Sequence, residues 1–200
     1  FARNLRRVVG SVARAHGGMS LTGYPARKWE HSRFRDPYLR EALQDYGIVI
    51  DTMECAVRWS TMEAVHAGVR AFAKSRPRTI VMTHISHAYP QGANLYFIFV
   101  GRFESKEEYL EYQYGIFDNI RKYGAGMSHH HGVGKMTSLW VEDSIGTEQL
   151  EVFRALKRHF DPHNIMNPGG TLALDLPPEE KRRPRFAGRT WDDPARPAPH

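Results

Sequence analysis

The sequence is 200 residues long, carries a formal net charge of +6 and is 41% hydrophobic, a composition typical of one globular domain. It contains no signal peptide and no apolar run of the roughly 18 residues that a membrane-spanning helix needs. A single cysteine, Cys55, excludes an internal disulfide and fits a reducing compartment, so we expect a cytoplasmic protein. Basic residues cluster near the two ends of the chain, which disfavours nucleic-acid binding, because nucleic-acid-binding proteins gather basic and aromatic residues on one folded surface.

The first half of the chain predicts a basic amphipathic helix over residues 1–16, a loop over 19–35 and a short helix over 37–45. A strand over residues 46–57 and a helix over 60–74 follow. The last of these helices begins with Ser60 and Glu63, which have the spacing of a capping box. The strand is predicted from its content of β-branched residues.

The second half predicts two strands, over residues 79–85 and 95–103, and a long helix over 105–124. A short strand over residues 139–141 and a helix over 147–160 follow. The first two strands pair around a turn at residues 89–92, and a second capping box at Ser105 and Glu108 opens the long helix. Elements in this order predict an α+β fold over residues 1–176, in which helices cover an antiparallel β-sheet. From Pro177 onward the chain is rich in proline and charge, so we expect an extended tail that becomes ordered only on a partner.

The segment SHHHGVGK carries three consecutive histidines, His129, His130 and His131, in the interior of the chain. Three imidazoles that titrate near neutrality can move protons, hold an anion or bind a metal, or they can be polar fillers beside a glycine turn. In an extended segment His129 and His131 would share one face, so the triplet would offer one metal ion at most two ligands. His84 and His87, three apart in a predicted strand, also tend to diverge. No cysteine pair or HExxH motif completes a metal site, so we expect no metal.

Two further side chains are candidates for chemistry. Tyr96 shares a strand face with Ile98 and Val100, and the pattern alone makes it a core residue. Its phenol would act as a base only beside cationic or hydrogen-bonding groups, which nearby histidines could supply. Arg40 lies on the short helix, where spacing alone favours a surface charge or an ion pair, although arginine also suits bidentate contact with phosphate or carboxylate.

Five short segments together carry a resemblance to a known family. They are YLRE at 38–41, IDTME at 50–54, GANLYF at 92–97, SHHHGVGK at 128–135 and DPHNIMNPG at 161–169. In this order they resemble the C-terminal half of the FAD-linked oxidases of the vanillyl-alcohol oxidase superfamily, and most closely the alkylglycerone-phosphate synthases. The resemblance extends from about residue 10 to residue 174 and implies a ferredoxin-like cap domain.

The resemblance implies a role for each candidate residue. Tyr96 corresponds to the tyrosine that abstracts a substrate proton, the three histidines to the groups that assist it beside the flavin, and Arg40 to the arginine that holds the acidic group of the substrate. His131 and Asn167 fall where the family contacts FAD. The implied activity is exchange of an acyl for an alkyl group on acyl-dihydroxyacetone phosphate, in ether lipid synthesis. The alternatives are an FAD-dependent oxidase or dehydrogenase of an alcohol or hydroxy acid, and a stand-alone ligand-binding cap domain.

Departures from related sequences refine these expectations. Flavoenzymes that oxidise D-2-hydroxy acids carry a histidine where Tyr96 stands and a glutamate where His130 stands, and these two residues belong to a metal-assisted site. Because this chain has neither residue at those positions, both hydroxy-acid oxidation and a metal are disfavoured. Gly170 replaces the lysine usual after Asn-Pro-Gly.

The FAD-binding domain of the family lies N-terminal and is absent from a chain that begins at Phe1 rather than at methionine. We therefore expect a part of a larger protein that does not hold FAD tightly alone. Its expected partners are that FAD-binding domain and a small phosphate-bearing or lipid-like substrate, with a homodimer and peripheral membrane association left open.

Overall fold

The computed structural model describes residues 1–177, so the predicted tail, apart from Pro177 itself, lies outside the described residues. The chain divides into two compact units, Phe1–Leu43 and the remainder from Gln44 onward. Within residues 1–177, no helix has both the length and the apolar character that crossing a membrane requires.

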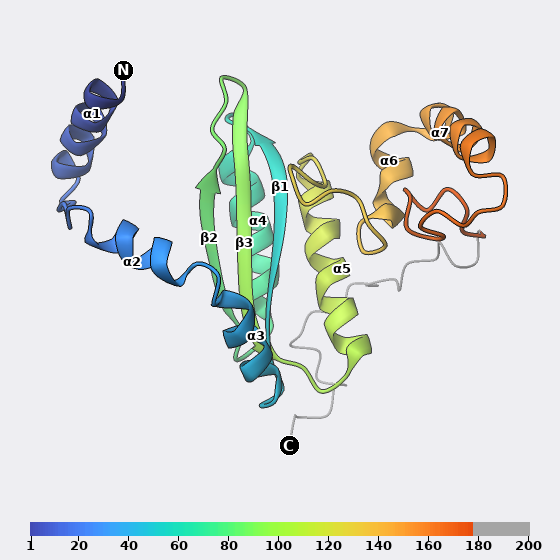
Figure 1. The fold of residues 1–200 in the computed structure, drawn as a ribbon, viewed down its shortest axis with the longest axis horizontal. Helices are drawn as coiled ribbons and strands as arrows, with labels where there is room; N and C mark the ends of the chain where they lie inside the picture. Colours follow the sequence, from blue (N-terminus) through green and yellow to red (C-terminus); the bar gives the residue numbers. More distant parts are fainter. Residues whose placement is uncertain (178–200) are drawn as a thin grey trace. The chain divides into compact units, whose positions relative to one another are not determined.

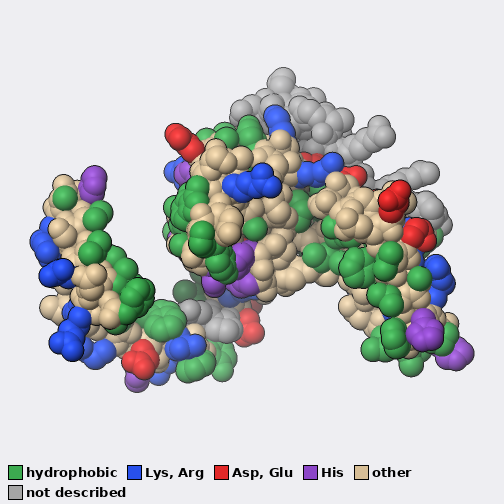
Figure 2. All heavy atoms as spheres, turned by 90° about the horizontal axis from the view of Figure 1, so that it is seen from above, with side chains coloured by type: hydrophobic (Ala, Val, Ile, Leu, Met, Phe, Trp, Pro, Cys, Tyr) green, Lys and Arg blue, Asp and Glu red, His purple; other side chains and the backbone are tan. Residues whose placement is uncertain are grey.

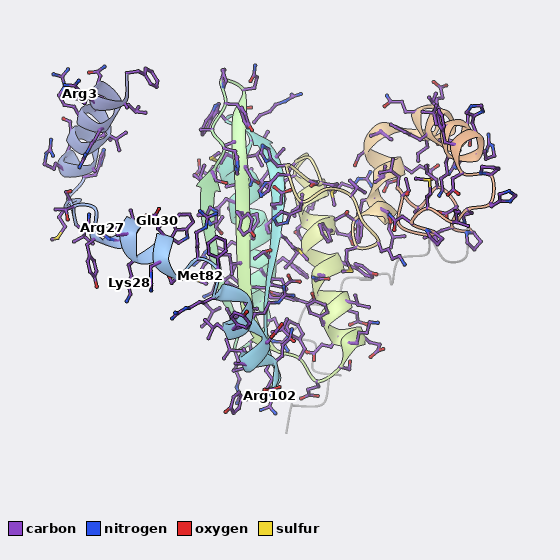
Figure 3. All side chains as sticks on the ribbon, viewed as in Figure 1. Arg3, Arg27, Lys28, Glu30, Met82 and Arg102 are labelled. Atoms are coloured by element: carbon purple, nitrogen blue, oxygen red, sulfur yellow. The ribbon has the colours of Figure 1, made fainter. Side chains whose placement is uncertain are left out.

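The first unit is helical and contains α1 (Ala2–Ala15), α2 (Tyr24–Ser32) and most of α3 (Asp36–Gln44). The basic helix predicted at the start is confirmed by α1, and Figure 2 shows its arginines and its apolar side chains on different sides. The expected loop over residues 19–35 is wrong, because α2 occupies its second half. Pro25 stands in the first turn of α2, where its missing N–H is not needed, and the exposed residues Arg27, Lys28 and Glu30 that follow are good helix formers (Figure 3).

The second unit is built on a three-stranded antiparallel sheet with the order β1-β3-β2 (Figure 1). Its strands and first helices are β1 (Ile48–Arg58), α4 (Met62–Ser75), β2 (Ile80–Ser86), β3 (Gly92–Arg102) and α5 (Lys106–Lys122). Because β1 and β2 both pair antiparallel with β3, they run parallel to each other, with α4 as their connection; this is the split β-α-β arrangement of ferredoxin-like folds. The predicted α+β fold is therefore confirmed, as is the turn before β3, where the Tyr89 N–H donates to the Gly92 carbonyl at 2.7 Å.

The two faces of the sheet have different environments. On one face α4 and α5 build the main core with alternate residues of β3 that are only 1–2% exposed, namely Leu95, Phe97 and Phe99. Tyr96, Ile98 and Val100 point to the opposite face and are half-buried. The expectation that Tyr96 is a core residue is therefore wrong: its two strand neighbours point into the core, and the phenol lies on the face away from the helices.

The two predicted capping boxes have different outcomes. At the start of α5 the Glu108 N–H donates to the Ser105 hydroxyl at 3.1 Å, as predicted. At the start of α4 the predicted box is wrong, since Thr61 is the N-cap and no side chain caps the helix. The Thr61 hydroxyl instead donates to the Arg58 carbonyl at 3.3 Å, which ties it to the end of β1.

After α5 the chain forms a short 3-10 helix, Ser138–Trp140, then α6 (Val141–Ile145) and α7 (Thr147–Phe160). The predicted helix over residues 147–160 is confirmed, but the predicted strand over residues 139–141 is wrong. Trp140 is fully buried, and its indole N–H donates to the Asp118 carboxylate of α5 at 2.7 Å. The short 3-10 helix places the Trp140 side chain against α5, and this packing explains the apolar residues for which a strand was predicted.

Candidate active site

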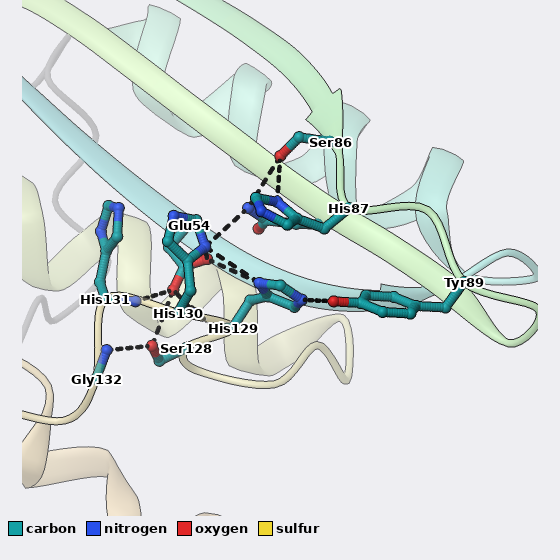
Figure 4. A network of polar contacts seen from close by, with 10 residues as sticks. Glu54, Ser86, His87, Tyr89, Ser128, His129, His130, His131 and Gly132 are labelled. Atoms are coloured by element: carbon teal, nitrogen blue, oxygen red, sulfur yellow. Dashed lines mark hydrogen bonds and ion pairs between the residues drawn. The ribbon is translucent and has the colours of Figure 1, made fainter. Parts of the chain in front are cut away.

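The site is organised by Glu54, a carboxylate of β1 whose side chain is only 1% exposed. Its Oε1 accepts the backbone N–H groups of His129, His130 and His131 at 2.7, 2.6 and 2.8 Å (Figure 4). The Ser128 hydroxyl donates to the same oxygen at 2.9 Å. Sequence reasoning gave Glu54 no role, although a charged residue between apolar neighbours in a strand was an available signal.

The backbone of the histidine triplet is curled, so the predicted alternation of its side chains is wrong. Three successive N–H groups converge on one oxygen, which is the concave geometry of an anion-binding nest. Gly132, with a φ of 77°, follows the curl, and its N–H donates to the Ser128 hydroxyl at 3.0 Å. Neighbouring rings are consequently brought together, and the centroids of His129 and His130 lie 5.3 Å apart.

The charge of Glu54 follows from two opposing effects on its pKa. Burial raises the pKa, but the N–H donors of His131, His130 and His129 and the Ser128 hydroxyl outweigh it and lower the pKa to about 2. Glu54 is therefore ionised at neutral pH and places a negative charge directly beneath the histidine rings.

The side chains of His129 and His130 approach each other and Glu54. Nδ1 of His130 lies 2.9 Å from Oε2 of Glu54 and 3.1 Å from Nδ1 of His129. On its other side, Nε2 of His129 lies 3.0 Å from the hydroxyl of Tyr89, in the turn before β3. The two rings are thus linked to a buried anion and to a phenol.

Tyr96 lies against three imidazoles. Its ring stacks on His84 with centroids 4.7 Å apart, meets His131 edge-on at 5.2 Å and lies 6.1 Å from His130. The structure therefore brings Tyr96 together with two of the three predicted histidines. The third, His129, is directed toward Tyr89.

His87 joins the same cluster, so the expected divergence of His84 and His87 is wrong. Its φ of 50°, just after the end of β2, turns the chain there, and its ring lies 4.8 Å from those of both His129 and His130. The ligand atoms of His87, His129 and His130 all lie within 4.8 Å of one another, close enough to share an ion. The triplet itself contributes two of these three groups, and the expectation of no metal stays a prediction.

The roles predicted for Arg40 and Asn167 stay predictions, because the contacts described above for this cluster include neither residue. Arg40 is an exposed residue of α3 in the first unit. Asn167 is exposed in the segment after α7, where its φ is 49° and its carbonyl accepts the Gly170 N–H at 3.0 Å. Asp161 orders that segment by accepting the N–H groups of Ile165 and Met166 at 2.9 and 3.0 Å.

An open pocket of about 510 Å³ adjoins the histidine cluster. His129 and Tyr89 form one side of it, and Arg58 at the end of β1 contributes a cation. Three glycines, Gly92, Gly124 and Gly126, also line the pocket. The pocket is large enough for part of a small-molecule substrate next to the imidazoles.

Comparisons with known proteins identify the family of the chain. A model of the family described as FAD linked oxidases, C-terminal domain, matches residues 3–171. Alkyldihydroxyacetonephosphate synthase of Dictyostelium discoideum is 32% identical over 171 residues, which are 82% of this chain and 28% of that protein. An uncharacterized FAD-linked oxidoreductase of Escherichia coli (strain K12) is 30% identical over 62% of this chain and 28% of its own length. A solved structure of alkyldihydroxyacetonephosphate synthase is 28% identical, with a TM-score of 0.48 over 70% of this chain and 23% of that chain. The chain thus spans less than a third of the length of these relatives.

Proposed function

The chain belongs to the FAD-linked oxidases as their C-terminal domain, and we propose that it is the substrate-binding and catalytic part of an enzyme that exchanges the acyl group of acyl-dihydroxyacetone phosphate for an alkyl group. The observation that carries the proposal is the contact of Tyr96 with His84, His130 and His131 on the face of the sheet away from α4 and α5. The name of the Dictyostelium relative supports the choice of reaction.

The residues of this face fit the reacting ring of FAD. The half-buried side chains of Ile98 and Val100 continue the face beside Tyr96, so a flat aromatic ring would meet apolar contacts next to a phenol and imidazoles. His131 and Asn167 are the residues that we assign to contact with FAD. When bound, FAD supplies the reactive ring of the exchange.

In this proposal Tyr96 is the general base. Its phenolate oxygen removes the proton from the carbon beside the ketone of the substrate, and the neighbouring imidazoles of His130 and His131 receive the phenol proton. Positioned general bases contribute a rate factor on the order of 10²–10⁴. Arg40 holds the phosphate of the substrate through charge-assisted, bidentate hydrogen bonds, for which the guanidinium is the best-shaped side chain.

The experiment that tests the proposal uses the full-length flavoprotein, acyl-dihydroxyacetone phosphate and an isotope-labelled long-chain alcohol. We expect the label to appear in an ether-linked product while a fatty acid is released in equal amount. Reduction of the flavin by the alcohol, with no ether product, would contradict the exchange. That result would support the second candidate, an FAD-dependent alcohol oxidase or dehydrogenase, which the name of the Escherichia coli relative favours.

A further inference from the structure

We propose that Glu54 is the positioning residue of His130: Oε1 fixes the backbone of the histidine triplet, and Oε2 accepts the Nδ1 proton of His130, which leaves Nε2 of that ring free to take a proton. The use of this proton in catalysis rests on the proposed function. The arrangement of Glu54 and His130 does not depend on it, because it follows from the contacts of the two residues.

The two oxygens of Glu54 have different tasks. Oε1 receives all three N–H groups of the triplet and the Ser128 hydroxyl, so its capacity to accept hydrogen bonds is filled. Oε2 is buried and accepts no regular hydrogen bond from the described residues, and Nδ1 of His130 lies 2.9 Å from it. A buried, charged oxygen without a donor is costly, so the imidazole beside it is expected to carry its proton on Nδ1.

The other neighbours of Nδ1 are weaker competitors. The Asn94 amide nitrogen is 3.5 Å away, at the upper limit of a hydrogen bond, whereas the charged carboxylate oxygen is 2.9 Å away. Charge-assisted hydrogen bonds are roughly twice as strong as neutral ones. The ionised Glu54 therefore decides which nitrogen of His130 is protonated.

The proton of His129 follows from the same reasoning. Two ring nitrogens 3.1 Å apart cannot both carry a proton directed at the other, so Nδ1 of a neutral His129 faces His130 with its lone pair. The proton of His129 then lies on Nε2 and is donated to the Tyr89 hydroxyl oxygen at 3.0 Å. The Nδ1 proton of His130 is then directed to Glu54, and the lone pair of His129 Nδ1 lies beside that N–H group.

This proton arrangement suits His130 for proton transfer beside Tyr96. The ring of His130 lies 6.1 Å from that of Tyr96, and its other titratable neighbours are His87 at 4.8 Å and His131 at 4.7 Å. When Nε2 accepts a proton, the ring becomes a cation whose Nδ1 lies 2.9 Å from the Glu54 anion. The carboxylate thus stabilises the charged ring and holds its orientation at the same time.

Nitrogen-15 NMR of histidine rings in the 200-residue chain tests the arrangement without any need for activity. At about pH 8, above the ordinary histidine pKa of about 6.5, we expect His130 in the wild-type chain to carry its proton on Nδ1. In Glu54→Gln we expect that preference to be lost. Asp51→Asn is the matched control, because Asp51 is a carboxylate of the same strand that accepts from Gln113 at 2.5 Å rather than from the histidines. A wild-type His130 protonated on Nε2 would overturn the inference, even if Glu54→Gln fails to fold.

Kinetics of the full-length flavoprotein test the catalytic use of this proton. Loss of a residue that orients a reacting group reduces activity by about 10- to 100-fold, so Glu54→Gln should lower kcat by that factor with a smaller effect on KM and a changed pH profile. Asp51→Asn should keep both kcat and the profile. If the wild-type NMR result holds but no ether product forms, the proposed function fails and the positioning role stands. If ether product forms and Glu54→Gln keeps the wild-type kcat and pH profile, the positioning role is refuted.

Discussion

Arg76 and Glu108 form an ion pair of 2.9 Å in which both side chains are about nine-tenths buried, and this pair joins the end of α4 to the first turn of α5. Glu108 also accepts the Glu104 N–H at 2.8 Å, and Arg76 donates to the Thr79 hydroxyl at 3.1 Å. The two helices that cover the sheet are therefore connected by charged groups as well as by the apolar core.

Removal of one partner of this pair should destabilise the chain strongly. Glu108→Gln leaves the Arg76 guanidinium buried without its counter-charge, which costs about 3–5 kcal/mol in comparable buried pairs. Urea unfolding followed by circular dichroism measures the loss. Glu151→Gln is the control, because it breaks a more exposed pair with Arg154 at 2.6 Å and should cost less than about 1 kcal/mol. Equal losses in the two variants would contradict the assignment.

The lowered pKa of Glu54 predicts a specific dependence of stability on pH. Its pKa is about 2 in the folded chain and 4.5 ordinarily, so its contribution is complete above about pH 4.5 and is lost as the pH falls toward 2. The difference of 2.5 units corresponds to about 3 kcal/mol at neutral pH. We expect the gap in unfolding free energy between wild type and Glu54→Gln to shrink as the pH falls from about 4.5 toward 2. A gap that is constant over this range would show that the charge of Glu54 is not what stabilises the triplet.

Loss of the Tyr96 hydroxyl should affect chemistry and leave folding intact. Because the phenol lies on the half-buried face of β3, Tyr96→Phe is expected to lower kcat for the exchange by a factor on the order of 10²–10⁴ without lowering Tm. Tyr112→Phe gives the opposite result, since the buried Tyr112 hydroxyl donates to the Ala73 carbonyl at 2.8 Å. That variant should lose about 1 kcal/mol of stability and keep its kcat. Near-wild-type turnover by Tyr96→Phe would remove the tyrosine from the role of base.

The proposed general base is the Tyr96 phenol with the imidazoles that contact it, so we expect catalysis to need no metal. We therefore expect the full-length flavoprotein to keep its activity after dialysis against EDTA. Loss of activity that added Zn²⁺ restores would instead assign His87, His129 and His130 as ligands.

The sequence predicted those parts of the fold that local patterns determine. The alternation in β3 correctly placed Tyr96 on one face with Ile98 and Val100, and Ser105 and Glu108 correctly marked the start of α5. The same alternation was misapplied to the histidine triplet, because its backbone conformation is imposed by Glu54, a residue 74 positions earlier than Ser128. The resemblance singled out Tyr96 and the histidine triplet, whose roles stay predictions, while their geometry depends on a long-range contact that no local pattern reveals.

The strand order also has a consequence for the behaviour of the chain in solution. Among the described residues β2 pairs with β3 alone, so the backbone groups along its outer edge have no strand partner. Ile80 and Met82 on this strand are 60% and 46% exposed, and Met82 is labelled in Figure 3. An apolar edge strand is a template on which a further strand can add, whether it comes from a neighbouring domain or from a second molecule. Preparations of the chain by itself are therefore expected to aggregate through β2 as concentration rises. A segment that pairs with this edge would prevent that aggregation.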